Sequence, residues 1–248
     1  MNRMLAWKAW LETRARFAVG AALLAALTIH TVAGGPETAA AIAASHPEST
    51  FTYGEYVWLQ LHAGFAQAVW IFTALLLAHG GLRRERAAGT AHLTLSLPVG
   101  RGRVLLVRTA VCVAELAALA LLPALLLAAL SPLAGEAYPL ADALRFAAAM
   151  LGGGLVFFAV GALLAHLFEG EYTAPTVGLG VVGAWFFAGK IPALHWLNAF
   201  DLMSGAGHLD EVTLLWETPL PWLGIAASLA AALLLMLAAA ALARAADY

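Results

Sequence analysis

The sequence predicts an all-α polytopic membrane protein with six transmembrane helices, in a single domain that covers residues 1–248. Composition is the first reason: 62% of the residues are hydrophobic and 11% are charged, whereas soluble domains average about 25% charged residues. The second reason is that apolar stretches recur which approach the roughly 20 residues needed to cross a bilayer. No alternating strand pattern recurs along the chain, so the spanning elements are expected to be helices.

The six predicted spans follow the apolar stretches in chain order. They cover about residues 17–32, 56–78, 104–130, 144–167, 172–187 and 221–242. The fifth contains Pro175, which ends or kinks a helix unless neighbouring groups satisfy the carbonyl that it leaves free. Residues 33–55 carry no Lys or Arg, as an outer loop may, and residues 188–220 are a second predicted outer loop.

Residues 1–16 are predicted to form a helix that lies flat in the membrane interface. Met4, Trp7 and Leu11 share one stripe of this helix, and charged residues lie beside them. The competing interpretation is a signal peptide, because residues 31–34 loosely resemble a cleavage site. The sixteen residues ahead of the apolar run have a helical pattern of their own, which favours the interfacial helix.

The basic residues predict the orientation. Of the 13 Lys and Arg residues, all but Arg145 and Lys190 fall on one side of the predicted membrane. Because basic residues mark the cytoplasmic side, both termini are expected in the cytoplasm, at a bacterial or archaeal plasma (inner) membrane. The net charge of −2 offers no basic surface to a nucleic acid. The lone Cys112 excludes a disulfide framework.

The connection between the second and third spans, residues 81–103, is the most polar and basic insert of the chain. Within it Gly89 breaks the preceding helix, Thr90 has the side chain to cap a short new helix, and Pro98 stops that helix. The connection is therefore predicted to contain a short helix with defined ends.

Leu93 and Leu97 lie one turn apart on this short helix and give it an apolar side. A helix of this kind along the cytoplasmic membrane surface suits the transmission of a push from a partner protein. The pattern alone leaves open the alternative that the connection is a basic loop that only fixes topology.

The connection resembles the cytoplasmic motif of ABC-2 type ABC transporter permeases. Members of that family commonly carry a run like E-x(3)-GT-x(4)-LLSLPV-x-R between their second and third spans. The matching residues here are Glu85, Gly89, Thr90, Leu93, residues 95–99 (LSLPV) and Arg101. The similarity extends to the overall plan, in which residues 191–203 correspond to an outer re-entrant segment before the last span. His92, Thr94 and Arg108 depart from the family pattern, which bears on the subgroup rather than on the family.

The resemblance implies ATP-driven transport, usually export, of a hydrophobic or amphiphilic substrate. It implies a separate ATPase subunit in two copies, which carries ATP and Mg²⁺, and a second permease subunit, identical or related. The residues that it assigns to ATPase contact are Glu85, Gly89, Thr90, Leu93, Leu97, Pro98 and Arg101. The chain itself is expected to be no enzyme and to hold no cofactor. Its only Gly-Lys pair, residues 189–190, lacks the other residues of a phosphate-binding loop.

Two polar residues inside the predicted spans are candidates for a substrate path. Glu115 lies about three turns into the third span, where an ionised carboxylate costs about 2.5–3.5 kcal/mol, and His62 lies in the outer part of the second span. The alternative for both is a hydrogen bond that only joins helices. No metal site is expected, because the histidines on the outer side match no ligand spacing: His30, His46, His195 and His208.

Two rival functions stay open from the sequence. Ser204 and His208 could serve an intramembrane enzyme, although turn chemistry explains a pair only four residues apart better than a nucleophile and its base do. The other rival is a non-transporting subunit for assembly or maturation. Dependence on a partner ATPase separates both from the transporter.

Overall fold

The computed structural model describes residues 2–45, 51–80, 89, 100–168 and 173–245. Within these ranges the regular structure is helical, apart from an isolated bridge between Leu209 and Trp216, and the predicted all-α class is confirmed. The helices are α1 (Asn2–Ser45), α2 (Tyr53–Val57), the π-helix η1 (Trp58–His62), α3 (Phe65–Ala78), α6 (Arg101–Leu130), the 3-10 helix η2 (Ser131–Ala134), α7 (Leu140–Leu167), α8 (Thr173–Ala188), the 3-10 helix η3 (Pro192–Leu197), α9 (Ala199–Ser204) and α10 (Trp222–Ala245).

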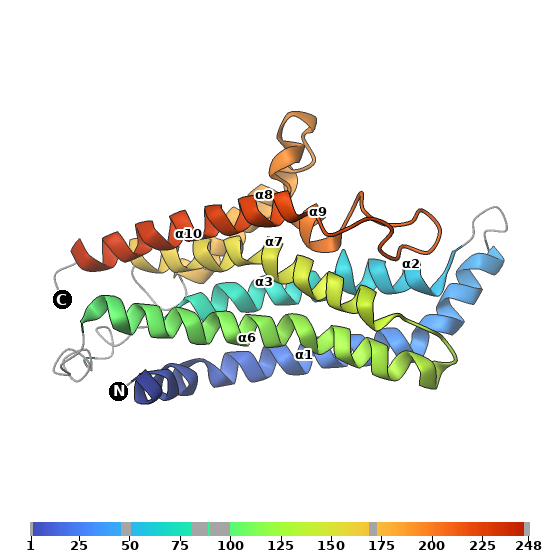
Figure 1. The fold of residues 1–248 in the computed structure, drawn as a ribbon, viewed down its shortest axis with the longest axis horizontal. Helices are drawn as coiled ribbons and strands as arrows, with labels where there is room; N and C mark the ends of the chain where they lie inside the picture. Colours follow the sequence, from blue (N-terminus) through green and yellow to red (C-terminus); the bar gives the residue numbers. More distant parts are fainter. Residues whose placement is uncertain (1, 46–50, 81–88, 90–99, 169–172, 246–248) are drawn as a thin grey trace.

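The long helices run along one axis, and α7 is the central one (Figure 1). It packs against α10, α6, α3, α9 and α8. Glycines on α7 permit this close approach: a Cβ on Gly154 would lie 2.4 Å from the Trp70 ring, and one on Gly161 would lie 3.0 Å from Ala78. Small residues let helix backbones come together where lipid offers no hydrophobic driving force between helices.

The start of α1 and the end of α10 lie at one end of the bundle, beside the end of α3 and the start of α6 (Figure 1). We call this the basic end, because the described segments there carry Arg3, Lys8, Arg14, Arg16, Arg103, Arg108 and Arg244. The other end, which holds α2, η2 and the start of α7, is the opposite end. The segregation of basic residues predicted from the sequence is therefore present in the fold.

Five helical segments in the described part of the chain are long and apolar enough to cross a membrane. They are Arg3–Ser45, Tyr53–Ala78, Gly102–Ala134, Leu140–Leu167 and Trp222–Arg244. The predicted span at 172–187 is the shorter α8, whose 16 residues cover about 24 Å of a hydrocarbon core of about 30 Å. Pro175 neither ends nor kinks α8. It lies in the first turn, where backbone N–H groups have no acceptor within the helix, so the lack of an N–H on proline breaks no helical hydrogen bond.

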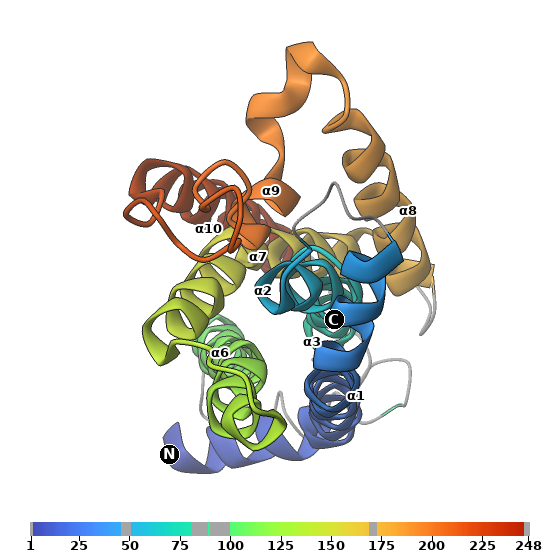
Figure 2. The same ribbon diagram turned by 90° about the vertical axis from the view of Figure 1, so that its right-hand side faces the viewer.

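The first predicted span and its surroundings differ from expectation, because α1 is one helix of 44 residues. No break separates the predicted interfacial helix at 1–16 from the span, and the expected loop from residue 33 is helical as far as Ser45. The helix is not straight. Figure 2 shows its first turns running across the end of the bundle, and in Figure 1 its last turns veer from the axis. Pro36 lies inside α1 and removes a backbone hydrogen bond there, a usual cause of such a kink.

The second span is less regular than predicted, and the second outer loop contains helices in the segment that resembles a re-entrant one. The span is interrupted at Ala63-Gly64, where the Ala63 N–H donates to the Trp58 carbonyl (2.9 Å) to close a π-helical turn. A Cβ on Gly64 would lie 2.0 Å from the Leu59 carbonyl oxygen, so the break requires glycine. In the outer loop, the predicted segment 191–203 contains two short helices, η3 and α9.

Candidate functional site

The predicted coupling residues lie mostly outside the described part of the chain. This applies to Glu85, Thr90, Leu93, Leu97 and Pro98. The two others are partly described. Gly89 is in a turn with φ +71°, a left-handed conformation that a glycine adopts without strain, and Arg101 is the first residue of α6.

The end of α3, from which this connection starts, lies by contrast within the described residues. Arg16 of α1 donates from Nη1 to the carbonyl of Leu76 (2.8 Å) and to that of His79. Arg108 of α6 donates from Nη2 to the carbonyls of His79 (3.1 Å) and Leu77 (3.4 Å). The last carbonyls of a helix have no partner within it, and arginines commonly supply one. Two arginines from different helices therefore hold the end of α3 where the connection begins. We call Arg16, Arg108 and the carbonyls that they bind the anchor.

Gly80 completes this anchor. Its φ of +140° is a conformation that residues with a Cβ rarely adopt. A Cβ built on it would lie 2.3 Å from Nη2 of Arg108. The Arg108 guanidinium consequently occupies the space that a side chain at position 80 would need, and both the backbone conformation and the arginine contact depend on glycine here.

Glu115 lies one to two turns deeper on α6 and is 4% exposed. Its Oε1 lies 2.5 Å from the Thr13 hydroxyl of α1. The same hydroxyl is 3.1 Å from the Ala9 carbonyl, which only accepts. A hydroxyl has one proton, so the Thr13 O–H is shared between the Glu115 carboxyl group and the Ala9 carbonyl. In the described residues Oε2 has no partner.

His62 lies elsewhere, towards the opposite end. Trp70 of α3 donates to the carbonyl of Leu116, the neighbour of Glu115. His62 precedes Trp70 by eight residues, which is about 12 Å along a helix. The structure therefore places the two predicted substrate-path residues at different depths and does not bring them together.

The His62 ring is part of a buried aromatic cluster. It stacks on Phe146 of α7 with ring centroids 3.7 Å apart, and its Nε2 lies 3.3 Å from the Tyr138 hydroxyl. Phe146 contacts Trp216 of the outer loop in turn (5.2 Å between centroids). This cluster joins η1, α7 and the loop, and the role that it gives His62 is packing.

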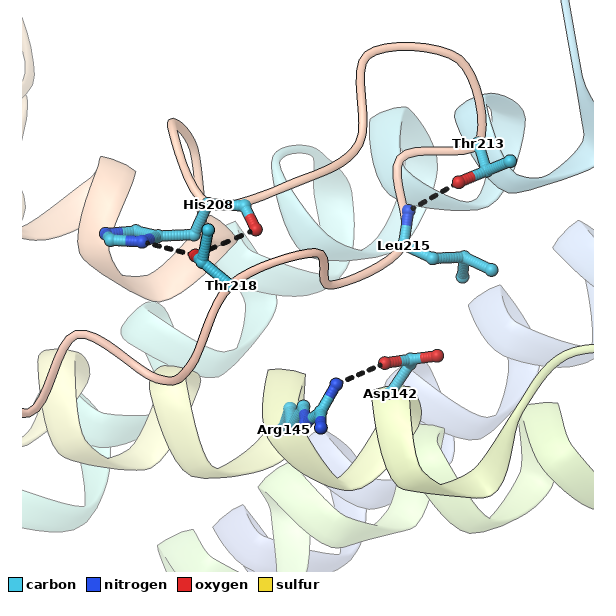
Figure 3. A network of polar contacts seen from close by, with 6 residues as sticks. All are labelled: Asp142, Arg145, His208, Thr213, Leu215 and Thr218. Carbon is cyan, nitrogen blue, oxygen red and sulfur yellow. Dashed lines mark hydrogen bonds and ion pairs between the residues drawn. The ribbon is translucent and has the colours of Figure 1, made fainter.

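Ser204 and His208, the pair behind the enzyme hypothesis, have different partners. The Ser204 hydroxyl is buried and donates to the Asp201 carbonyl (3.2 Å). His208 Nδ1 lies 3.0 Å from the Thr218 hydroxyl, and Figure 3 shows the ring turned toward Thr218. The arrangement is that of a folded turn, not of a nucleophile with its base.

The same outer loop is ordered by a second set of contacts. Asp210 Oδ1 accepts from the Thr213 N–H (2.7 Å), the Thr213 hydroxyl (2.8 Å) and the Val212 N–H (3.1 Å). These donors favour the carboxylate and hold the pKa of Asp210 below its ordinary value of 3.8. Nearby on α7, Asp142 pairs with Arg145 (3.1 Å, Figure 3), one of the two basic residues predicted on the outer side.

Sequence reasoning placed Arg16 in the predicted interfacial helix at 1–16, noted Arg108 only as a departure from the family pattern, and gave Gly80 no role. The only signal for their part in the anchor was the position of both arginines at the edge of a predicted span. Their acceptors are backbone carbonyls, which leave no trace in the sequence pattern.

Comparison with known proteins gives one match. The model of a family described as ABC-2 family transporter protein matches residues 18–215, which is 198 of the 248 residues. The match runs from α1 to the outer loop and includes the connection at 81–103, together with Gly80 and Arg108 of the anchor, whereas Arg16 lies two residues before the matched range. No curated protein matches the chain.

Proposed function

Because the chain belongs to the ABC-2 family of transporter proteins, we propose that it is the permease subunit of an ATP-driven exporter for a hydrophobic or amphiphilic substrate. Family membership supports the role in transport as such. The direction, the substrate class and the separate ATPase subunit are further steps of the proposal. The 248 residues contain no phosphate-binding loop sequence, so we assign ATP and Mg²⁺ to the partner.

The observation that carries the proposal is the anchor at the root of the connection. Arg16 and Arg108 join the end of α3 to α1 and to α6. A force applied to residues 81–99 therefore reaches three long helices at once. In this proposal the ATPase binds the connection and contacts Glu85, Gly89, Thr90, Leu93, Leu97, Pro98 and Arg101.

The proposed orientation follows from the basic end. Lys and Arg concentrate on the cytoplasmic side of membrane proteins, so the basic end, both termini and the connection face the cytoplasm of a bacterial or archaeal cell. There they meet two copies of the ATPase. A second permease subunit, identical or related, completes the transporter. We count α8 as the sixth span, with local thinning of the bilayer compensating for its length.

Glu115 and His62 remain proposed positions along the substrate path, at two separate depths. Glu115 fits this role better, because one of its oxygens is buried without a partner in the described residues. Intramembrane carboxyl groups are costly and commonly functional. The hydrogen bond to Thr13 supplies the competing explanation, in which Glu115 only joins α6 to α1.

Affinity purification of the tagged chain from native membranes in mild detergent, followed by mass spectrometry, tests the proposal first. We expect an ATPase subunit in a stoichiometric amount. Recovery of the chain without an ATPase would indicate that the connection is a basic loop that only fixes the topology. That result would favour the assembly function.

Substitution of a coupling residue tests the site. Leu93→Asp should abolish ATPase binding or transport while membrane insertion is unchanged, because an ionised side chain replaces the apolar contact. Leu133→Asp is the matched control: Leu133 is 83% exposed in η2, at the opposite end of the bundle. Full transport and full ATPase binding in Leu93→Asp would refute the assignment of the connection.

A further inference from the structure

A groove of about 670 Å³ runs along the bundle at the basic end, between α6 and α10. The helix α10 packs along α7 and meets α6 at only a few positions, so the end of α7 forms the floor of the groove. The walls are hollow because small residues line them, among them Ala110, Ala114 and Ala117 on α6 and Ala240 and Ala243 on α10. Pockets of roughly 300–1,000 Å³ are typical of small-molecule sites.

The shape of the groove fits a chain-like ligand. Its lining on α6 extends from Gly102 to Ala117, which is about 22 Å of helix. One leaflet of the hydrocarbon core is about 15 Å thick. An acyl chain that enters from the surface at the basic end therefore fits within the length of the groove.

Two arginines, Arg108 and Arg244, are among the residues that line the groove. Arg244, near the end of α10, has no hydrogen bond or ion pair among the described residues. Arg108 lines the groove as well; its Nη2 is used by carbonyls of α3, whereas its Nε is buried without a partner. None of the described lining residues is Asp or Glu. The nearest acidic residue on α6, Glu115, is turned to Thr13 of α1 instead.

We propose that this groove binds an anionic phospholipid, with its phosphate at Arg244 and Arg108 and one acyl chain along the alanine-lined walls. Basic pockets between transmembrane helices recognise anionic headgroups in this way. A second copy of the chain fits less well. The described lining offers arginines and no carboxylate, which favours an occupant that carries a negative charge beside an apolar chain. The site shares Arg108 with the anchor, but lipid binding requires neither ATPase nor transported substrate, so it can be tested separately from the proposed transport function.

The test is native mass spectrometry of the full chain, with any co-purifying partners. The protein is released from vesicles that contain equal amounts of phosphatidylglycerol and phosphatidylcholine. The wild-type chain should retain phosphatidylglycerol in preference to phosphatidylcholine. Arg244→Gln should lower this retention about fivefold, the contribution of one basic residue near an anionic membrane surface. Arg14→Gln removes the same charge from an exposed residue of α1 outside the groove and should have no effect.

A pair of neighbouring substitutions tests the walls. Ala240→Phe fills the groove and should abolish selective retention, whereas Ala241→Phe adds the same ring on an exposed position of α10 outside it and should not. Equal retention of both lipids by the wild-type chain, or equal losses in the two alanine variants, would overturn the proposal. So would dissociation of a dimer by Ala240→Phe with phosphatidylglycerol retention unchanged, which identifies a second copy as the occupant.

Discussion

The two ends of the bundle hold their buried polar groups by different means. At the basic end, Arg16 and Arg108 reach from α1 and α6 to backbone carbonyls of α3. At the opposite end, His62 is fixed by a ring stack on Phe146 and a neutral contact with Tyr138. Charge-assisted bonds are directional and survive at a half-buried helix end, whereas stacking needs close packing on all sides.

This difference assigns distinct mechanical roles to the two ends. A helix end held by two long side chains is able to shift while the guanidinium groups stay bonded, because arginine has several donors and rotatable bonds. A closely packed aromatic cluster resists gradual deformation, because its side chains can rearrange only between discrete packing arrangements. We therefore expect the basic end to transmit movement and the opposite end to serve as the rigid support. Four predictions test this comparison, beginning with the largest expected effect.

Phe146→Ala should cost about 3 kcal/mol or more of the free energy of unfolding, because it opens a cavity at a fully buried site and removes the stacking partner of His62. Denaturation in mixed micelles measures this, with Leu133→Ala, an exposed leucine at the same end, as the control. ATPase stimulation per folded molecule should stay at the wild-type level. A coupling defect with unchanged stability would reverse the roles of the two ends.

Arg108→Leu should lower stability by about 1.5–3 kcal/mol, the usual contribution of hydrogen bonds from a charged donor, and should also reduce transport per ATP hydrolysed. The carbonyls of Leu77 and His79 lose a donor, and the end of α3 then keeps only Arg16 of α1 and the weak Cys112 thiol donor of α6 (3.6 Å to the Leu77 carbonyl). Arg108→Lys keeps the charge but not the planar fork, and should be intermediate. Arg14→Leu removes an exposed arginine of α1 as the control. Unchanged coupling in Arg108→Leu would make the anchor purely structural.

The Glu115–Thr13 contact separates a path residue from a helix-joining residue. In a double-mutant cycle of Glu115→Gln and Thr13→Val, we expect a coupling energy near 0.6 kcal/mol, the average for interhelical bonds within membranes. The amide retains a donor for Thr13, so Glu115→Gln alone should be nearly neutral for stability. A large loss of transport in this variant identifies a path residue. Wild-type transport in Glu115→Gln leaves only the role of joining α6 to α1.

The sequence predicted well what depends on local composition. Apolar length located five of the spanning helices, and the Lys and Arg distribution located the basic end. The failures arise from tertiary context. Nothing local requires α1 to continue beyond Val32, since Gly34, Gly35 and Pro36 all favour an end to the helix there.

The candidate site shows the same division. The spacing of Gly89, Leu93 and Pro98 singled out the connection as the site of ATPase contact, and that assignment stays a prediction. The anchor escaped prediction because Arg16 and Arg108 meet across 92 positions of sequence at acceptors of the main chain. His62 was singled out as polar, whereas only its neighbours in space, Phe146 and Tyr138, reveal its use in packing.

The smallest expected effect concerns the outer loop that covers the aromatic cluster. Hydrogen bonds from Thr213 and Val212 lower the pKa of Asp210 in the folded loop, so the carboxylate stabilises the loop fully above its ordinary pKa of 3.8. That contribution is lost as the pH falls further, through the lowered pKa. Hydrogen-exchange protection of the Val212 and Thr213 amides should therefore decrease in acid. Asp210→Asn should show the lower protection already at neutral pH, with no further decrease in acid. Acid-sensitive protection that persists in Asp210→Asn would assign the effect to another group. Because Trp216 of this loop contacts Phe146, the same experiment asks whether the loop supports the rigid end or merely covers it.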